Sequence, residues 1–159
     1  MSGMINAIYS TGRSRAPLEP LEQSTLEAGR GLVGDRYYLG TGTFSKKLAG
    51  KPDAEVTLVE SEEIERFNGT HRLSISVGAF RRNIVTSGVR LNDLIGVTFS
   101  VGKATLEGIR LCEPCAHLAG LVTPEVLPGL VGRAGLRARV VTGGTVSPGD
   151  AITVPLDRS

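Results

Sequence analysis

Residues 97–111 read VTFSVGKATLEGIRL, and this stretch has the pattern of two β-strands joined by a tight turn. Apolar and polar side chains alternate from Val97 to Val101, a two-residue period that is typical of a strand with one buried face. Gly102 and Lys103 then predict a hairpin connection. The run from Ala104 to Leu111 predicts the second strand, so the local pattern indicates an antiparallel pair.

Short strands separated by glycine turns recur along the whole chain. The sequence has 21 glycines in 159 residues, with only four phenylalanines, three tyrosines and no tryptophan, which indicates many tight turns. We found no alternation of strand, helix and strand, and therefore expect one mostly β domain over residues 1–159, a mostly antiparallel β-barrel with a few short peripheral helices. Ser61 is the expected cap of one helix, and Ser10–Glu27 is expected to be an extended loop. The other expected strands are Met4–Tyr9, Glu55–Val59, Asn83–Thr86, Arg137–Thr142 and Ala151–Val154.

The only two cysteines lie directly after the second of the two quoted strands, in Cys112-Glu113-Pro114-Cys115. The residues that follow, CAHLAGL, have a helix-like pattern. A cysteine in the first turn of a helix lies near unpaired N–H groups and the positive end of the helix dipole, which lower its pKa and favour the thiolate. Such a sulfur suits redox exchange, sulfur transfer or metal ligation.

Two familiar uses of paired cysteines fit this chain poorly. Structural zinc needs four ligands, and the chain adds only His117 and the distant His71 to its two cysteines. A thioredoxin-like dithiol would need the βαββα order after the motif, which is absent here. A role for Cys112 and Cys115 as a dithiol pair nevertheless stays open.

Gly29–Gly34 (GRGLVG) fits the dinucleotide-binding pattern G-x-G-x-x-G literally. That fingerprint must follow an apolar strand and begin a helix. Neither flanking segment has that character, since STLEA precedes the run and DRYYLGTG follows it. We expect irregular backbone here rather than a Rossmann fold.

Charge and hydropathy restrict the partners. A net charge of +2 and few aromatic residues argue against a nucleic-acid partner. No apolar run is long enough to span a membrane, and the N-terminus lacks the pattern of a signal peptide, so we expect a cytoplasmic protein without a membrane partner. Arginines and lysines occur in small clusters that could converge on a small anionic ligand.

An ordered series of segments resembles the MOSC domain, the family named for the C-terminal domain of molybdenum cofactor sulfurase. The resemblance covers about residues 26–155, and its strength lies in the order of the segments together with the position of the cysteine. Cys112 is an additional thiol beside the motif cysteine. The matching segments are Gly31–Tyr37 (GLVGDRY), Arg82–Gly88 (RNIVTSG), Leu91–Gly96 (LNDLIG), Pro114-Cys115, Gly135–Arg137 (GLR) and Gly149–Ile152 (GDAI).

The resemblance implies a β-barrel that binds a molybdenum–pterin cofactor, with Cys115 as the molybdenum ligand and catalytic residue. A low-pKa thiolate is a soft ligand that suits this metal. The cofactor's phosphate would need cationic and N–H donors. The candidate cofactor-binding residues are Arg36, Arg82 and Arg110 for the phosphate and Asn83 for the pterin.

Three functions follow from the resemblance and stay open. The first is a reductase module for N-hydroxylated or similar small compounds, which takes electrons from a separate donor protein. The second is a carrier in which Cys115 bears a persulfide, received from a sulfur-donor protein, for the assembly of metal–sulfur cofactors. The third is a non-catalytic cofactor-binding protein. We favour the first because we expect no fused sulfurase domain that would supply sulfur.

Overall fold

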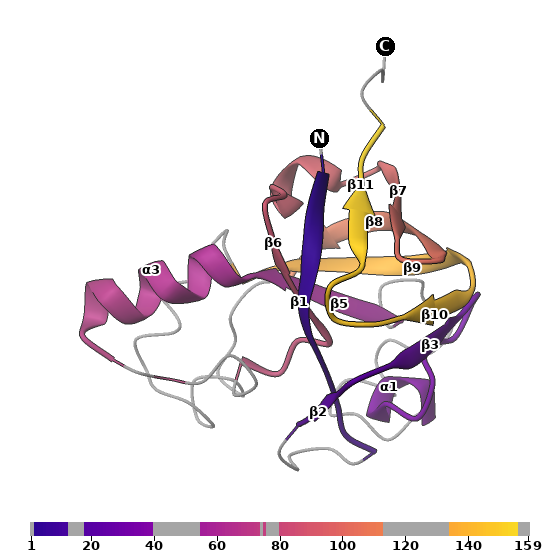
Figure 1. Cartoon of the computed structure of the whole chain (residues 1–159), viewed down its shortest axis with the longest axis horizontal. Coiled ribbons are helices and arrows are strands. Elements are labelled where there is room, and N and C mark those ends of the chain that lie inside the picture. Colours follow the sequence, from indigo (N-terminus) through magenta and orange to yellow (C-terminus); the bar gives the residue numbers. More distant parts are fainter. Residues whose placement is uncertain are drawn as a thin grey trace.

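The computed structural model describes residues 2–12, 18–39, 55–73, 75, 80–112 and 134–155. Its main feature is a sheet of eight strands (Figure 1). The strands are β1 (Ser2–Ser10), β2 (Glu19–Leu21), β5 (Val56–Glu60), β6 (Ile84–Ser87), β7 (Thr98–Val101), β8 (Ala104–Leu111), β9 (Leu136–Thr142) and β11 (Ala151–Thr153).

This sheet closes into a barrel. Its strand order is β11-β7-β8-β9-β5-β6-β1, with β2 added beyond β1, and a further pairing of β1 with β11 joins the two ends. In that closing pair Gly3 lies opposite Ile152. The expected mostly β barrel is therefore confirmed, and each strand expected from sequence is present within a few residues of its predicted limits.

The interior of the barrel is apolar because each strand alternates its side chains between the two faces. In β7 the order is exposed, buried, exposed, buried, and β8 begins with the same alternation. Phe99, Val101 and Leu106 consequently point into one cluster with Leu58 and Leu136 from the facing strands. Complete burial of such a side chain stabilises the fold by about 1.5–3 kcal/mol, so this cluster is the main source of stability.

One connection differs from the expected topology. Helix α3 (Ser61–His71) follows β5 and leads to β6, and β5 pairs with β6 in parallel, with Leu58 opposite Ile84. A strand–helix–strand unit is therefore present, although sequence reasoning found none. The periodicity of a strand indicates its buried face and does not name its partner, so the parallel pair could not be read from either segment alone.

Helix α3 covers part of the outer surface of the barrel. Ile64 and Phe67 on its buried face pack with Val59 and Val85, whose side chains leave the sheet on its outer side. Its cap residue is Glu60 rather than the predicted Ser61, and no side chain caps the helix. The helix instead begins with acidic side chains in its first turn, which interact favourably with the helix dipole.

The expected loop at residues 10–27 is partly strand. It contains β2 and β3 (Ser24–Glu27), and β3 pairs with β4 (Gly31–Leu32) and β10 (Gly144–Val146) in a second sheet. The glycine run therefore forms an antiparallel turn, unlike a dinucleotide-binding loop. Gly31 has φ +103, and a Cβ there would lie 2.0 Å from the carbonyl oxygen of Glu55, so only glycine fits.

Two short helical segments complete the described structure. They are α1 (Arg36–Leu39) after the second sheet and a 3-10 turn, η3 (Leu91–Leu94), before β7. Across the described ranges, no helix combines the length and apolar character that a membrane crossing requires.

Candidate functional site

Cys112, the first residue of the cysteine segment, directly follows the end of β8, where β8 pairs with the start of β9. The N–H of Cys112 donates to the carbonyl oxygen of Gly135 at 2.8 Å, one step beyond the last strand pair, Leu111 with Leu136. Cys112 is a free thiol and only 1% exposed. Cys115, the predicted molybdenum ligand, lies outside the described residues, so its role stays a prediction.

A row of polar residues crosses the outer face of the barrel next to this point. Arg110 of β8 lies opposite Arg137 of β9, and Arg137 lies opposite Thr57 of β5. Asn83 continues the row, since its N–H donates to the carbonyl oxygen of Thr57 at 3.1 Å. We call these four residues the outer row. It brings two predicted cofactor-binding residues, Arg110 and Asn83, onto one face although 27 positions separate them in sequence.

The side chains of the outer row point away from the core because their neighbours along each strand point inward. Leu136 and Ala138 flank Arg137 and belong to the barrel interior, as do Val56 and Leu58 on either side of Thr57. The row therefore lies on the outer side of the barrel wall, where Thr57 and Asn83 are buried, and is separate from the apolar interior.

Asn83 has a clear structural role in this row. Its Oδ1 accepts from the backbone N–H of Thr57 at 3.1 Å and from the Thr57 hydroxyl at 3.3 Å, and its Nδ2 donates to the carbonyl oxygen of Tyr9 at 3.2 Å. The residue is 2% exposed. One amide thus links β1, β5 and β6, and direct contact of Asn83 with a pterin stays a prediction.

Arg82 reaches the residues just before β9. Its Nε donates to the carbonyl oxygen of Ala134 at 2.9 Å, while the next carbonyl, that of Gly135, accepts from Cys112. Arg82 and Cys112 are thus bound to consecutive peptide groups. Arg36 begins α1, and its side chain lies outside the described part of the structure.

Arg81 is a residue that sequence reasoning passed over in favour of its neighbour. It is 8% exposed and has φ +64, a left-handed backbone that residues other than glycine adopt rarely. Strained backbone of this kind persists where the surrounding structure enforces it, and it is concentrated at functional sites. No feature of the sequence distinguishes Arg81 from Arg82, because both are arginines in one short run.

Charges on the next part of the outer face are balanced. Arg139 pairs with Glu107, which lies opposite it in the β8–β9 register. Glu55 accepts from the N–H of Val140 at 2.7 Å. Burial raises the pKa of the Glu55 carboxyl, while hydrogen bonds from the backbone and the charge of Arg139 act in the opposite direction. This region thus combines acidic and basic side chains, whereas the residues of the outer row nearest Cys112 are two arginines, Arg110 and Arg137.

A comparison with known protein families identifies the family of this chain. The model of the MOSC domain matches residues 45–153, well over half of the chain. The chain belongs to the MOSC domain family. A search of curated proteins finds no match.

Solved structures confirm the fold of this MOSC protein. The YuaD protein from Bacillus subtilis superposes with a TM-score of 0.80 at 16% identity, over 96% of this chain and 94% of that one. YiiM from Geobacillus stearothermophilus gives 0.71 at 18% identity, over 96% of this chain and 75% of the other. YiiM from Escherichia coli gives 0.64 at 17% identity, over 98% and 71%. At these identities the likeness shows a shared fold alone.

Proposed function

We propose that this MOSC protein binds a molybdenum–pterin cofactor beside the end of β8, with Cys115 as the molybdenum ligand. In this proposal it is a reductase module for N-hydroxylated or similar small compounds and receives electrons from a separate donor protein. The observation that supports the proposal most is the gathering of Arg82, Arg110 and Arg137 around the strand ends that flank the cysteine segment.

The donor groups at these strand ends fit such a cofactor. Guanidinium groups bind phosphate through paired, charge-assisted hydrogen bonds, and a cysteine thiolate is a soft metal ligand. Cys115 follows Cys112 by three positions, a reach of at most about 11 Å. Arg110 precedes Cys112 by two residues. In this proposal a single cofactor would contact Cys115 through its metal and Arg110 through its phosphate.

Each group of residues would have a distinct task. The arginines would hold the phosphate and orient the cofactor, and Asn83 would keep β1, β5 and β6 in register beneath it. When bound, molybdenum would supply the redox chemistry that protein side chains lack. The buried Cys112 would pack at the strand end and stay unligated, which separates the roles of the two cysteines.

The test compares the two cysteines directly. Wild-type protein from a molybdenum-replete host should contain near-stoichiometric amounts of molybdenum and pterin relative to protein. Cys115→Ala should lose nearly all the molybdenum and the reduction of N-hydroxylated compounds, because no second thiolate is placed to replace it. Cys112→Ala, the matched control, should retain both. Metal analysis and pterin fluorescence provide the measurement.

The persulfide carrier is the main competing outcome. After treatment with a cysteine desulfurase, mass spectrometry would then show one additional sulfur atom on Cys115, in protein that holds no molybdenum. Absence of both metal and pterin from the wild type would contradict our proposal.

A further inference from the structure

Helix α3 contains a chemically reactive pair of residues, Asn68 followed by Gly69. The sequence has four asparagines, and only this one precedes a glycine. The next backbone nitrogen attacks an asparagine side chain most readily when it belongs to glycine, because no Cβ blocks the approach. Gly69 and Thr70 are exposed, so water reaches this part of the helix. The pair is therefore the position in the chain most prone to lose its side-chain amide.

The chain leaves α3 through a strained turn. The N–H of Leu73 donates to the carbonyl oxygen of Asn68 at 2.8 Å, and that of Arg72 donates to Gly69 at 3.4 Å. This pair of bonds is the Schellman motif, in which the left-handed position is usually glycine. Here that position is Arg72, with φ 55 and ψ 44. Because a Cβ disfavours left-handed backbone, this end of the helix opens more readily than its packed middle.

The Asn68 side chain holds the chain that follows the helix. Its Nδ2 donates to the carbonyl oxygen of Ile75 at 2.9 Å, and its Oδ1 accepts from the N–H of Ile75 at 3.2 Å. We call these two bonds the Asn68 clip. Leu73 and Ile75 pack against the buried cluster that contains Phe67. While the helix is closed, its backbone and the clip hold the carboxamide away from the Gly69 nitrogen, so the reaction requires the last turn to open.

We propose that Asn68 is a modification site, which deamidates when the last turn of α3 opens. The nitrogen of Gly69 forms a bond to Cγ of Asn68, and the bond from Cγ to Nδ2 breaks. Nδ2 leaves as ammonia with the proton of the Gly69 N–H. Water then opens the cyclic imide at either carbonyl group and leaves aspartate or isoaspartate at position 68. Water is the only co-reactant, and the site is independent of the proposed cofactor.

The product cannot restore the Asn68 clip. A carboxylate still accepts from the N–H of Ile75, but it has no N–H to donate to the Ile75 carbonyl oxygen. Its negative charge is also unfavourable near the C-terminus of a helix. Isoaspartate adds a main-chain carbon, which displaces the bonds of the Schellman motif. The modification is therefore a one-way switch that weakens the packing of Leu73 and Ile75 beside Phe67.

The first experiment follows the purified full-length protein by peptide mass spectrometry during incubation in mildly alkaline buffer. Aspartate and isoaspartate should accumulate at position 68, and enzymatic methylation of isoaspartate provides a second readout. Gly69→Ala is the control that should block the reaction, since its methyl group hinders the attack, has open space and favours the helix. Absence of product from the folded wild type, under conditions that deamidate the urea-unfolded chain, would overturn the proposal.

A second comparison tests whether the last turn controls the reaction. Arg72→Gly keeps the reactive pair and removes the strain of the left-handed residue, so it should slow deamidation about fivefold. Leu73→Ala weakens the packing of the same turn and should accelerate it. Equal rates in wild type and both variants would mean that opening of this turn is not the controlling step.

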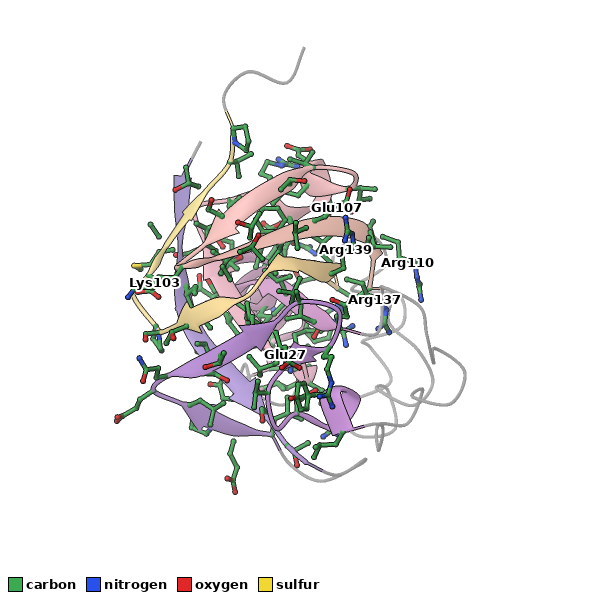
Figure 2. The ribbon with its side chains drawn as sticks, turned by 90° about the vertical axis from the view of Figure 1, so that its right-hand side faces the viewer. Glu27, Lys103, Glu107, Arg110, Arg137 and Arg139 are labelled. Atoms are coloured by element: carbon green, nitrogen blue, oxygen red, sulfur yellow. The ribbon has the colours of Figure 1, made fainter. Side chains whose placement is uncertain are left out.

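A third comparison separates opening of the helix end from unfolding of the whole barrel. Helix α3 extends from one side of the barrel in Figure 1, and Figure 2 views the barrel from the opposite side, with Glu107 and Arg139 in view. Arg139→Gln breaks the ion pair of these residues, and Leu106→Ala leaves a cavity in the core. Both variants should be less stable in urea and still deamidate at the wild-type rate. A rate that rises in step with the lost stability would overturn the proposal.

The last measurement tests the switch itself. In the deamidated fraction the backbone amides of Leu73 and Ile75 should exchange with solvent about tenfold faster than in fresh protein, because the clip is lost. Asn68→Asp should reproduce this increase, and aged Gly69→Ala should not show it. Unchanged protection of both amides in the deamidated fraction would overturn the switch.

Discussion

The interior of the barrel and its outer face between β6 and β8 are built from the same strands and differ in what their residues do. The apolar side chains that point inward form one cluster, and the hydroxyl of Thr86, which is also buried, donates to the carbonyl oxygen of Val59. The side chains that point outward include Val59 and Val85 beneath α3 and the outer row, which has a hydrogen-bonded amide at one end and two arginines at the other. The inner face is therefore specified by alternation alone, and the outer face by which residues the strand register places side by side.

The largest effect is expected from the interior. Leu106 of β8 is fully buried, and Leu106→Ala should lower the free energy of unfolding by about 2–5 kcal/mol through lost burial and a cavity. Val141 on the paired strand β9 is 37% exposed, and Val141→Ala should change stability by less than about 0.5 kcal/mol. Urea denaturation provides the measurement. Similar losses in both variants would mean that the two faces do not differ as described.

An intermediate effect is expected at the buried end of the outer row. Asn83→Ala leaves the N–H of Thr57 and the carbonyl of Tyr9 without their side-chain partner, which should cost about 1–3 kcal/mol for each group left unpaired. Asn6 also makes two side-chain hydrogen bonds, with Ser61 and Ser87, but in an exposed position. Asn6→Ala should therefore cost less than Asn83→Ala in the same denaturation series. An equal cost would show that burial does not strengthen the contacts of Asn83.

The smallest effect concerns the balanced part of the outer face. Burial raises the pKa of Glu55 above its ordinary value of 4.5, so the folded protein binds this proton more tightly than the unfolded chain. The free energy contributed by this group therefore falls as pH rises through 4.5 and then through the higher folded pKa. Glu55→Gln removes this dependence, and its amide oxygen can still accept from Val140. Between about pH 4 and about pH 7, the free energy of unfolding of Glu55→Gln should therefore decrease less than that of the wild type.

A control at the exposed Glu19 makes the last comparison specific. Glu19→Gln should leave the pH dependence of unfolding close to that of the wild type. An identical pH dependence in wild type and Glu55→Gln would mean that the buried carboxyl does not contribute to it.

Much of the fold could be predicted because its signals are local. Strands β7 and β8 follow from apolar alternation and a glycine turn within 15 residues, and the acidic first turn of α3 follows directly from Glu62 and Glu63. The second sheet was missed because its strands are only two to four residues long, too short for alternation to show. The parallel pairing of β5 with β6 was missed because it depends on a helix crossing between them.

The candidate site was predictable only in part. Arg110 and Asn83 were selected from residue type and resemblance, and the register of four strands places them in one row. The sequence shows Arg137 only as a member of a charge cluster, because its position opposite Arg110 depends on the strand register. Arg81 became distinguishable from Arg82 only through its burial and its left-handed backbone.

The sequence by itself determined that this chain is a small glycine-rich β-barrel of the MOSC family with its two cysteines directly after a strand. Alternation, turn residues and ordered motifs are properties of neighbouring positions, so they can be read without coordinates. Only the tertiary structure decided that β1 and β11 close the barrel and that a β-bulge after Gly108 places Arg110 opposite Arg137. Both depend on contacts between distant segments, such as the approach of Gly108 to the Leu94 carbonyl, which no local pattern contains.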